Sequence, residues 1–346
     1  MIDTTRKHPR HFFSDVLHLK LLPLCILFLF SSHSVFARNG VEMHFRGAIN
    51  TKNIIYMRLV QTSDDSLHGE YMYLTGGTWI PVKGSCKSGR CNFSEYNDPQ
   101  NSSRITGTFI GGIKDTSLNG MWLSPDSSKF YRFELSQSGS SIESYKTRKI
   151  VTLPEGAPDS IAVVEAFAPK LMRLEDEKLR QSINTFLEKE MSEYSYSQRL
   201  PSFEFVAENS YTVHYISNLL LSISSRGEDN SGGVHPNTHS LMTTINLKTG
   251  KPLKFKECFK PASLKKINTI INDALAKCGV DDDTRKGATL KPTSENFCVD
   301  AYRVTFDITN VLRQGEQQCA HVDILLKDLT DSIDPKGTFK MFLLLW

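Results

Sequence analysis

The chain has 346 residues, of which 39% are hydrophobic and 23% are charged, and its formal net charge is +3 at pH 7. This length is enough for two domains of ordinary size, and the hydrophobic content is typical of a soluble globular protein. The small net charge argues against a nucleic acid or an anionic membrane as partner, because both favour a large excess of basic residues.

The first 37 residues have the pattern of a secretory signal peptide. Four basic residues precede an apolar run at 21–30, and Val35-Phe36-Ala37 is a small-x-small cleavage sequence. The run is about half as long as the ~20 residues of a membrane span. We therefore expect cleavage before Arg38, a periplasmic protein and no membrane insertion after cleavage; an uncleaved anchor is the alternative. Cleavage removes four basic and two acidic residues, which lowers the net charge from +3 to +1.

Residues 38–138 are predicted to form an antiparallel β domain, a meander that closes into a barrel or a curved sheet. Short alternating runs are separated by Gly, Asn, Asp and Ser, as in successive hairpins. The expected strands are 43–49, 54–60, 67–73, 78–82, 91–96, 105–110, 118–123 and 130–135.

A weak Gly-x-aromatic repeat supports repeated hairpins in this domain. It occurs at Gly69-Glu70-Tyr71, Gly77-Thr78-Trp79, Gly107-Thr108-Phe109 and Gly120-Met121-Trp122. A glycine that lets the backbone bend, next to an aromatic ring that fills the core, suits a closed or strongly curved sheet. A platform of aromatic rings for carbohydrate is the functional alternative.

A Ser- and Gly-rich stretch at 137–144 predicts a linker at 139–148, which leads to an α+β domain at 149–346 with two main helices on an antiparallel sheet. Apolar residues at helical spacing indicate helices at 174–194 and 261–277, the second with Ser263 as its N-cap. A polar loop is expected at 226–233. The expected strands are 161–167, 203–207, 212–216, 219–223, 241–247, 253–255, 299–308 and 320–325.

Six cysteines remain after the predicted signal peptide, and an even number in an exported protein indicates disulfides. Cys86 and Cys91 flank a hairpin tip and are predicted to pair. Cys258 and Cys278 flank a helix that holds them ~20 Å apart, which excludes a bond between them. We expect Cys278 to pair with Cys298, and Cys258 to pair with Cys319. Metal binding by cysteine is the competing interpretation.

The stretch 232–259 is the most distinctive of the chain. Gly232 and Gly233 precede His235-Pro236-Asn237-Thr238-His239, a strand follows, and Asn246 to Lys251 forms a tight turn before Phe259-Lys260-Pro261. These motifs resemble those of the domain that forms the extracellular part of the anti-sigma factor RsiV and that accompanies some peptidoglycan deacetylases. The resemblance covers about residues 150–337, and it implies binding of a protein ligand such as lysozyme.

Three enzyme hypotheses are alternatives to this binding role. His235 and His239 could ligate a metal ion, but Pro236 breaks the helix that their spacing would need. Thr305-Phe306-Asp307 is similar to part of the metal motif of polysaccharide deacetylases, but the second Asp is replaced by Ile308, so a core strand is the better interpretation. The sequence has no nucleophile elbow, P-loop or dinucleotide fingerprint.

The sequence thus predicts a non-catalytic binding protein of the cell envelope, without a cofactor or a metal. Its expected partner is lysozyme or another protein ligand, or the peptidoglycan glycan itself. The candidate ligand-binding residues are Gly232, Gly233, His235, Asn237, Thr238 and His239, although a structural turn is the favoured interpretation of this segment. The alternative is a cell-wall carbohydrate hydrolase or deacetylase that uses His235 and His239.

Overall fold

The computed structural model describes residues 40–97, 104–152, 161–191, 196–200, 203–230 and 237–344. Residues 34–346 belong to one compact unit. The predicted signal peptide and its cleavage site lie outside the described residues. Within the described ranges, no helix is both long and apolar enough to cross a membrane.

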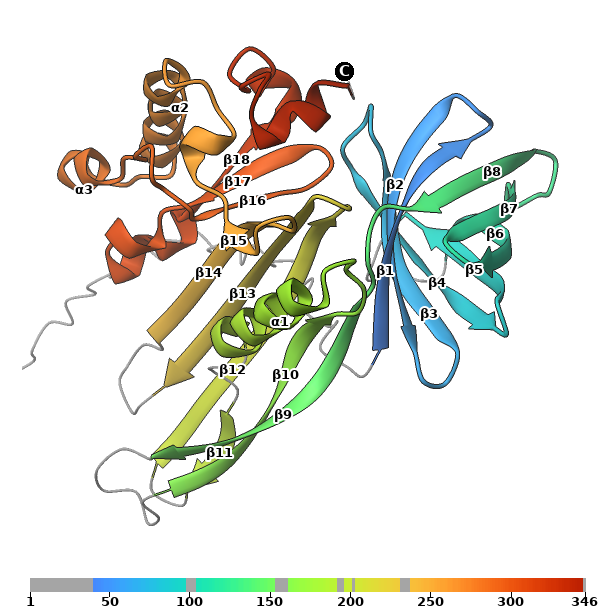
Figure 1. The fold of residues 1–346 in the computed structure, drawn as a ribbon, viewed down its shortest axis with the longest axis horizontal. Coiled ribbons are helices and arrows are strands. Elements are labelled where there is room, and N and C mark those ends of the chain that lie inside the picture. The colour runs from blue at the N-terminus through green and yellow to red at the C-terminus, as the bar shows by residue number, and fades with distance from the viewer. Residues whose placement is uncertain are drawn as a thin grey trace, which may run out of the picture. The chain divides into compact units, whose positions relative to one another are not determined.

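Eight strands form an antiparallel barrel, and all eight lie where the sequence predicts strands (Figure 1). They are β1 (Gly40–Ile49), β2 (Asn53–Thr62), β3 (Ser66–Tyr73), β4 (Trp79–Lys87), β5 (Arg90–Tyr96), β6 (Ile105–Lys114), β7 (Ser117–Leu123) and β8 (Phe130–Gln137). Each strand pairs with the next, and β8 pairs back onto β1, where Ile49 lies opposite Phe133. This last pairing closes the sheet into a barrel. The sequence predicted either a barrel or a curved sheet and did not decide between them.

Apolar and aromatic side chains fill the inside of the barrel. Tyr71 and Phe109 of the Gly-x-aromatic repeat belong to this core, together with Phe93 and Phe133. A Cβ atom on Gly107 would overlap the indole ring of Trp122, so only glycine fits there. Trp122 packs against the same core, whereas Trp79 packs on the outer side of the barrel against the core that contains Tyr56. All four rings of the repeat therefore pack against a core, where a carbohydrate platform would need them exposed.

One carboxylate is buried in this aromatic interior. The Glu95 side chain accepts hydrogen bonds from the Tyr71 hydroxyl and from Nε1 of Trp122, the latter at 3.1 Å. Trp122 in turn stacks on Tyr131, with ring centroids 5.7 Å apart. Two donors on one carboxylate offset much of the cost of burying its charge.

The predicted linker at 139–148 is in large part a strand. β9 (Ile142–Thr152) pairs with the first residues of β1 and with β10 (Ile161–Leu171), so the barrel sheet continues through it. The composition is polar, but Ile142 is buried against Leu171 and α1. The backbone pairing and this apolar contact make the segment a strand despite the Ser- and Gly-rich stretch at its start. β10 also runs past the predicted strand end, since Pro169 lies within it.

A second antiparallel sheet contains β11 (Tyr196–Leu200), β12 (Phe203–Ile216), β13 (Leu220–Asn230), β14 (Asn237–Asn246) and β15 (Lys251–Pro252), in this order. Two predicted strands, 203–207 and 212–216, are thus one strand with a register shift between Val213 and Tyr215. The first predicted helix is α1 (Glu177–Met191), whose Ile183 and Leu187 are buried in the core beside this sheet.

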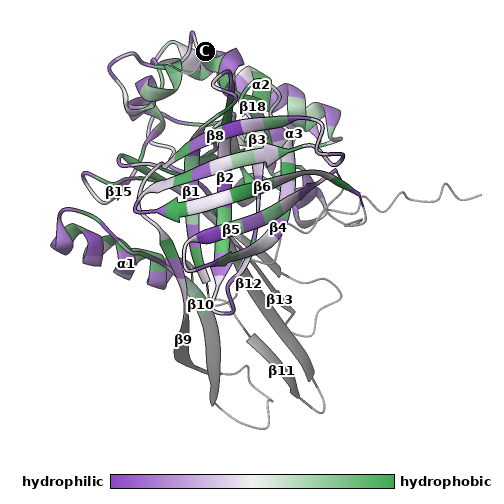
Figure 2. Cartoon of the chain, turned by 90° about the vertical axis from the view of Figure 1, so that its right-hand side faces the viewer, coloured by the Kyte–Doolittle hydropathy of each residue, from purple (hydrophilic) through white to green (hydrophobic). Residues whose placement is uncertain are grey.

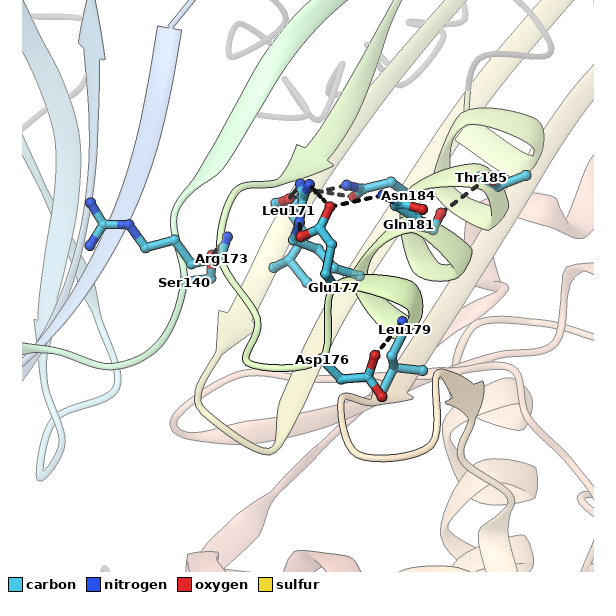
Figure 3. Close-up of polar contacts among 10 residues, drawn as sticks. Ser140, Leu171, Arg173, Asp176, Glu177, Leu179, Gln181, Asn184 and Thr185 are labelled. Atoms are coloured by element: carbon cyan, nitrogen blue, oxygen red, sulfur yellow. Dashed lines mark hydrogen bonds and ion pairs between the residues drawn. The ribbon is translucent and has the colours of Figure 1, made fainter.

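Polar contacts tie α1 to the end of β10 (Figure 3). The amide of Leu171 donates to Oδ1 of Asn184 at 2.8 Å, and its carbonyl accepts from Asn184 Nδ2 and Arg180 Nη1, both at 3.1 Å. Asp176 accepts from the Leu179 amide at 3.0 Å, as an N-cap residue does. This cap explains why the helix begins at Glu177, after the predicted start.

The remaining elements are a three-stranded sheet, two helices and short 3-10 turns. The sheet has β16 (Phe297–Val299), β17 (Arg303–Asp307) and β18 (His321–Leu325), and the helices are α2 (Ser263–Lys277) and α3 (Asp282–Gly287). Buried phenylalanines dominate the core between them: Phe255, Phe259, Phe297, Phe306, Phe339 and Phe342.

The N-cap residue of each helix in this region differs in kind, and the one predicted for α2 needs correction. Ala262 is the N-cap of α2 in place of Ser263, because Ser263 lies inside the helix and its hydroxyl donates to the Ser332 carbonyl at 3.3 Å. The acidic run 281–283 is the start of α3, where Asp281 accepts from the amides of Asp283 and Thr284. The Asp281 carboxylate thus caps this helix.

A buried charge pair on the outer side of β2 and β3 contacts the second sheet. Arg58 and Glu70 are cross-strand neighbours that form an ion pair, and only 8% of each side chain is exposed. Arg58 Nη1 also donates to the Val213 carbonyl at 3.1 Å, and its guanidinium lies 4.8 Å from the Trp79 ring centroid. Arg58 therefore satisfies a backbone acceptor of β12 from a barrel strand.

The structure contains the predicted Cys86–Cys91 disulfide, between paired positions of β4 and β5. The other two predicted bridges are not formed: Cys278 pairs with Cys319, at a Cα–Cα distance of 6.0 Å, while Cys258 and Cys298 are free and buried. The Cys298 thiol lies 3.1 Å from the carbonyl of Ile223. β16 thus holds Cys298 against β13, where it stays free. Cys278 forms its disulfide with Cys319, which lies just before β18.

Candidate functional site

The residues predicted to bind a ligand lie at the start of β14. Gly232, Gly233 and His235 are outside the described residues. Asn237, Thr238 and His239 are the first three residues of β14 and pair with Asp229, Glu228 and Gly227 of β13. Their side-chain positions are not described, so the roles predicted for them stay predictions.

Part of the polar loop predicted at 226–233 is a strand. Arg226 to Asn230 belong to β13, because they continue the pairing with β12 on one side and with β14 on the other. Polar residues are tolerated there, since ladder hydrogen bonds do not depend on side-chain type. Among the residues that the structure describes, no group of three or more His, Cys, Asp or Glu side chains is placed to hold a metal ion.

The next residue of β14 takes part in a polar cluster that joins two sheets. Ser240 donates to Oδ2 of Asp307 at 2.8 Å, and its Oγ lies 3.3 Å from Nε2 of His321. Asp307 ends β17 and His321 begins β18, where the two are paired residues. Thr309 donates to Oδ1 of Asp307 from its amide at 2.9 Å and from its hydroxyl at 2.6 Å. We call Ser240, Asp307, Thr309 and His321 the Asp307 cluster.

Serine, histidine and aspartate also make up the catalytic triad, but this geometry differs from a triad. There the histidine lies between the other two and removes the serine proton through Nε2. Here the single hydroxyl proton of Ser240 goes to Asp307, and His321 Nε2 lies 3.9 Å from Oδ1 of the same carboxylate. The serine is therefore held by the carboxylate and is not activated as a nucleophile.

The charge state of His321 fits this arrangement. Burial lowers the pKa of His321, and the nearby Arg226 acts in the same direction, while the carboxylates of Asp307 and Asp323 oppose the shift. The ring is thus neutral at pH 7, with one nitrogen that donates and one that accepts. The hydroxyl of Ser240 donates its hydrogen bond to Asp307, so its oxygen is left to accept one from His321, which assigns the ring proton to Nε2. His321 is consequently an uncharged part of the hydrogen-bond network.

A hollow of ≈ 280 Å³ lies between the loop before β16 and the short turn after β17, and Asp307 is one of its lining residues. We call it the Asp307 hollow. Its apolar lining includes Leu290, Ile308 and Val311, and the Val311 side chain is exposed. Its other polar lining residues carry hydroxyl, amide and carboxyl groups: Thr289, Thr293, Ser294, Glu295, Asn296 and Asn310. The polar lining residues can both donate and accept hydrogen bonds, and an apolar patch lies beside these residues.

The sequence pattern predicts that Asp307 lies in a core strand and indicates no functional role for it. β17 is indeed a strand, and Phe306 is fully buried in it. Asp307 is buried as well, with 6% of its surface exposed, although it is a charged residue. A carboxylate at the end of an apolar strand was the available signal. Ser240 and His321 gave none, because they are 81 residues apart and meet only through sheet packing.

Comparison with known proteins finds weak similarity to solved structures. No family model matches this chain, and no curated protein matches it. A solved structure from Bacteroides fragilis, a member of the DUF3298 family, is 14% identical with a TM-score of 0.41 and covers 58% of this chain and 95% of that one. A DUF3298 family protein from Pseudomonas aeruginosa is 12% identical with a TM-score of 0.37 and covers 56% and 95%. Similarity at this level does not inform on activity, and the RsiV-type resemblance stays a prediction.

Proposed function

We propose that this chain is a non-catalytic binding protein of the cell envelope that holds a hydroxyl-rich ligand of the wall-glycan kind in the Asp307 hollow. The observation that supports this most is the lining of the hollow, where hydroxyl, amide and carboxyl groups surround a small apolar patch. A sugar ring presents hydroxyl groups around its rim and C–H groups on its face, so it needs both kinds of contact. The predicted signal peptide supports a place outside the cytoplasm.

The size of the hollow favours a glycan unit over a folded protein as the principal ligand. A volume of ≈ 280 Å³ lies near the lower end of the range of ~300–1,000 Å³ found for ligand pockets. One unit of a polymer or a small molecule fits such a volume. A protein such as lysozyme would need ~800 Å² of surface on each partner, with large buried anchor residues at its centre.

The Asp307 cluster supports binding over catalysis. Three donors on Asp307 fix its carboxylate, and Ser240 is held as a donor to it. A fixed carboxylate orients a bound hydroxyl group at little entropic cost, because its own position is already set. Hydrolysis or deacetylation by His235 and His239 is the alternative, and it would require a metal ion at residues outside the described part.

Calorimetric titration of the purified protein tests this proposal. Soluble peptidoglycan fragments and lysozyme are titrated separately, and the metal content of the same sample is measured. We expect saturable heat with the glycan fragments, and its loss in Asn310→Leu, which places an apolar side chain in the hollow. The matched control is Asn272→Leu, an exposed asparagine on α2 that lines a different hollow.

Three results would contradict the proposal in different ways. Binding of lysozyme without any glycan binding would make a protein the ligand. Stoichiometric zinc together with release of sugar or acetate would make the protein an enzyme. Equal loss of glycan binding in Asn310→Leu and Asn272→Leu would place the binding site elsewhere.

A further inference from the structure

The outer surface of the barrel is covered on one side and exposed on another. Tyr56 on β2 and Met72 on β3 are fully buried in a core that also contains residues of β16, β17 and α2, and Trp79 packs against it. The outward residues of β6, β7 and β8 include the most exposed large apolar side chains of the barrel. The side that carries β5, β6 and β8 faces the viewer in Figure 2.

Four of these outward side chains are contiguous by strand register. Ile110 of β6 lies directly opposite Met121 of β7, and Leu123 of β7 lies directly opposite Phe130 of β8. Met121 and Leu123 are two residues apart on one strand, so they share a face. Phe130 is 67% exposed, Ile110 49% and Met121 36%. We call these four side chains the β6–β8 apolar face.

The alternating residues confirm that this face points outward. Phe109, next to Ile110, is fully buried in the barrel core, and Trp122, between Met121 and Leu123, packs against the same core. Because neighbouring residues of a strand point to opposite sides, the four apolar side chains cannot serve the barrel interior. Single exposed apolar residues are common, but a contiguous group on one sheet face indicates a contact surface.

Charged groups of both signs flank this face. Arg132 and Glu134, on β8, form an ion pair at 2.7 Å, and their side chains are 75% and 60% exposed. Asp126 and Lys129, in the turn before Phe130, are also exposed. An anionic membrane or a polyanion would select a rim of one sign. A rim with two cations and two anions is complementary to a copy of itself, as a two-fold interface requires.

We propose that the β6–β8 apolar face is a self-association surface, through which two copies of this chain pack face to face. Every strand from β5 to β8 is paired on both sides within the barrel, so a copy cannot add as an extra edge strand. Contact therefore uses side chains, as in two stacked sheets. The Arg132–Glu134 pair can exchange partners across the interface, because an exposed ion pair contributes little within one chain.

Sedimentation velocity over a range of protein concentrations tests this proposal. We expect a monomer–dimer equilibrium, and a shift to the monomer in Met121→Lys. Met172→Lys is the matched control, since Met172 is 37% exposed and lies outside the barrel; it should dimerise like the unchanged chain. Far-ultraviolet circular dichroism of each variant verifies that the fold is kept.

A charge exchange separates a specific interface from non-specific apolar adhesion. Arg132→Glu should weaken dimerisation by about tenfold or more, because it places like charges across the interface. The double variant Arg132→Glu with Glu134→Arg should restore it.

A monomer at every concentration would overturn the proposal, as would equal effects of Met121→Lys and Met172→Lys. Met121-dependent binding of a monomer to vesicles of anionic phospholipid would also overturn it and assign the face to a membrane. Glycan binding by Met121→Lys is expected to be unchanged, which keeps this test separate from that of the Asp307 hollow.

Discussion

The disulfide between Cys278 and Cys319 should stabilise the protein more than the one between Cys86 and Cys91. This disulfide connects the C-terminal end of α2 to the segment just before β18. Its cysteines are 41 residues apart in sequence, whereas those of the hairpin disulfide are 5 apart. In the chain-entropy model, loops of these lengths correspond to about 4 and about 2 kcal/mol at 25 °C. Replacing both cysteines of a bridge by alanine should lower the free energy of unfolding by these amounts.

Urea denaturation of the two double-alanine variants, followed by circular dichroism, measures this difference. The hairpin variant is the matched control, because it also removes two sulfur atoms and one covalent bond. Peptide mapping under non-reducing conditions identifies the bridges independently. A bridge that includes Cys258 or Cys298 would refute the assignment, and equal losses of stability in the two variants would refute the loop-length reasoning.

Three further predictions concern buried polar groups. Arg58→Met and Glu70→Met should each lower the free energy of unfolding by ~3–5 kcal/mol, because each leaves a buried charge unpaired. The double variant should lose much less than the sum of these two values, and a double-mutant cycle in urea measures the coupling. Burial lowers the pKa of His214 to about 3, so between pH ~6.5 and that value the unfolded chain binds a proton that the folded chain does not. The free energy of unfolding should therefore be highest above pH ~6.5 and fall towards pH 4, by up to ~1.4 kcal/mol per pH unit. His214→Gln should flatten this pH dependence. Tyr71→Phe removes a donor from the buried Glu95 carboxylate and should cost ~1–3 kcal/mol in thermal or chemical unfolding, with no loss if that hydrogen bond is absent in solution.

Local sequence pattern was sufficient for most of the elements. The eight barrel strands follow from alternating apolar residues between turn residues, because a strand with one buried face needs that alternation. The two main helices follow from apolar residues at helical spacing, of which Ile183, Leu187, Ile267 and Ile271 are fully buried. The fold class of both parts was therefore predictable, and the hairpin disulfide needed only a short loop between two cysteines.

Pattern failed where long-range contacts outweigh local composition. The start of β9 was predicted to belong to a linker because the stretch 137–144 is rich in serine and glycine, but pairing with β1 and β10 makes it a strand. The sequence alone excluded a Cys258–Cys278 bond from the length of α2. It could not select between the two remaining pairings, because that choice depends on how β16 and β18 pack, nor show that two thiols stay free.

The candidate site shows the same division. From the sequence alone, a Gly- and His-containing segment before β14 was the natural place to expect a ligand, and an apolar run ending in Asp307 indicated only a core strand. The tertiary structure brings Ser240, Asp307 and His321 together from three strands, since the ends of β14, β17 and β18 meet where two sheets pack. Residue type and spacing are local properties that a sequence records directly. Which side chains share a buried position is decided by sheet packing, and only the folded chain contains that information.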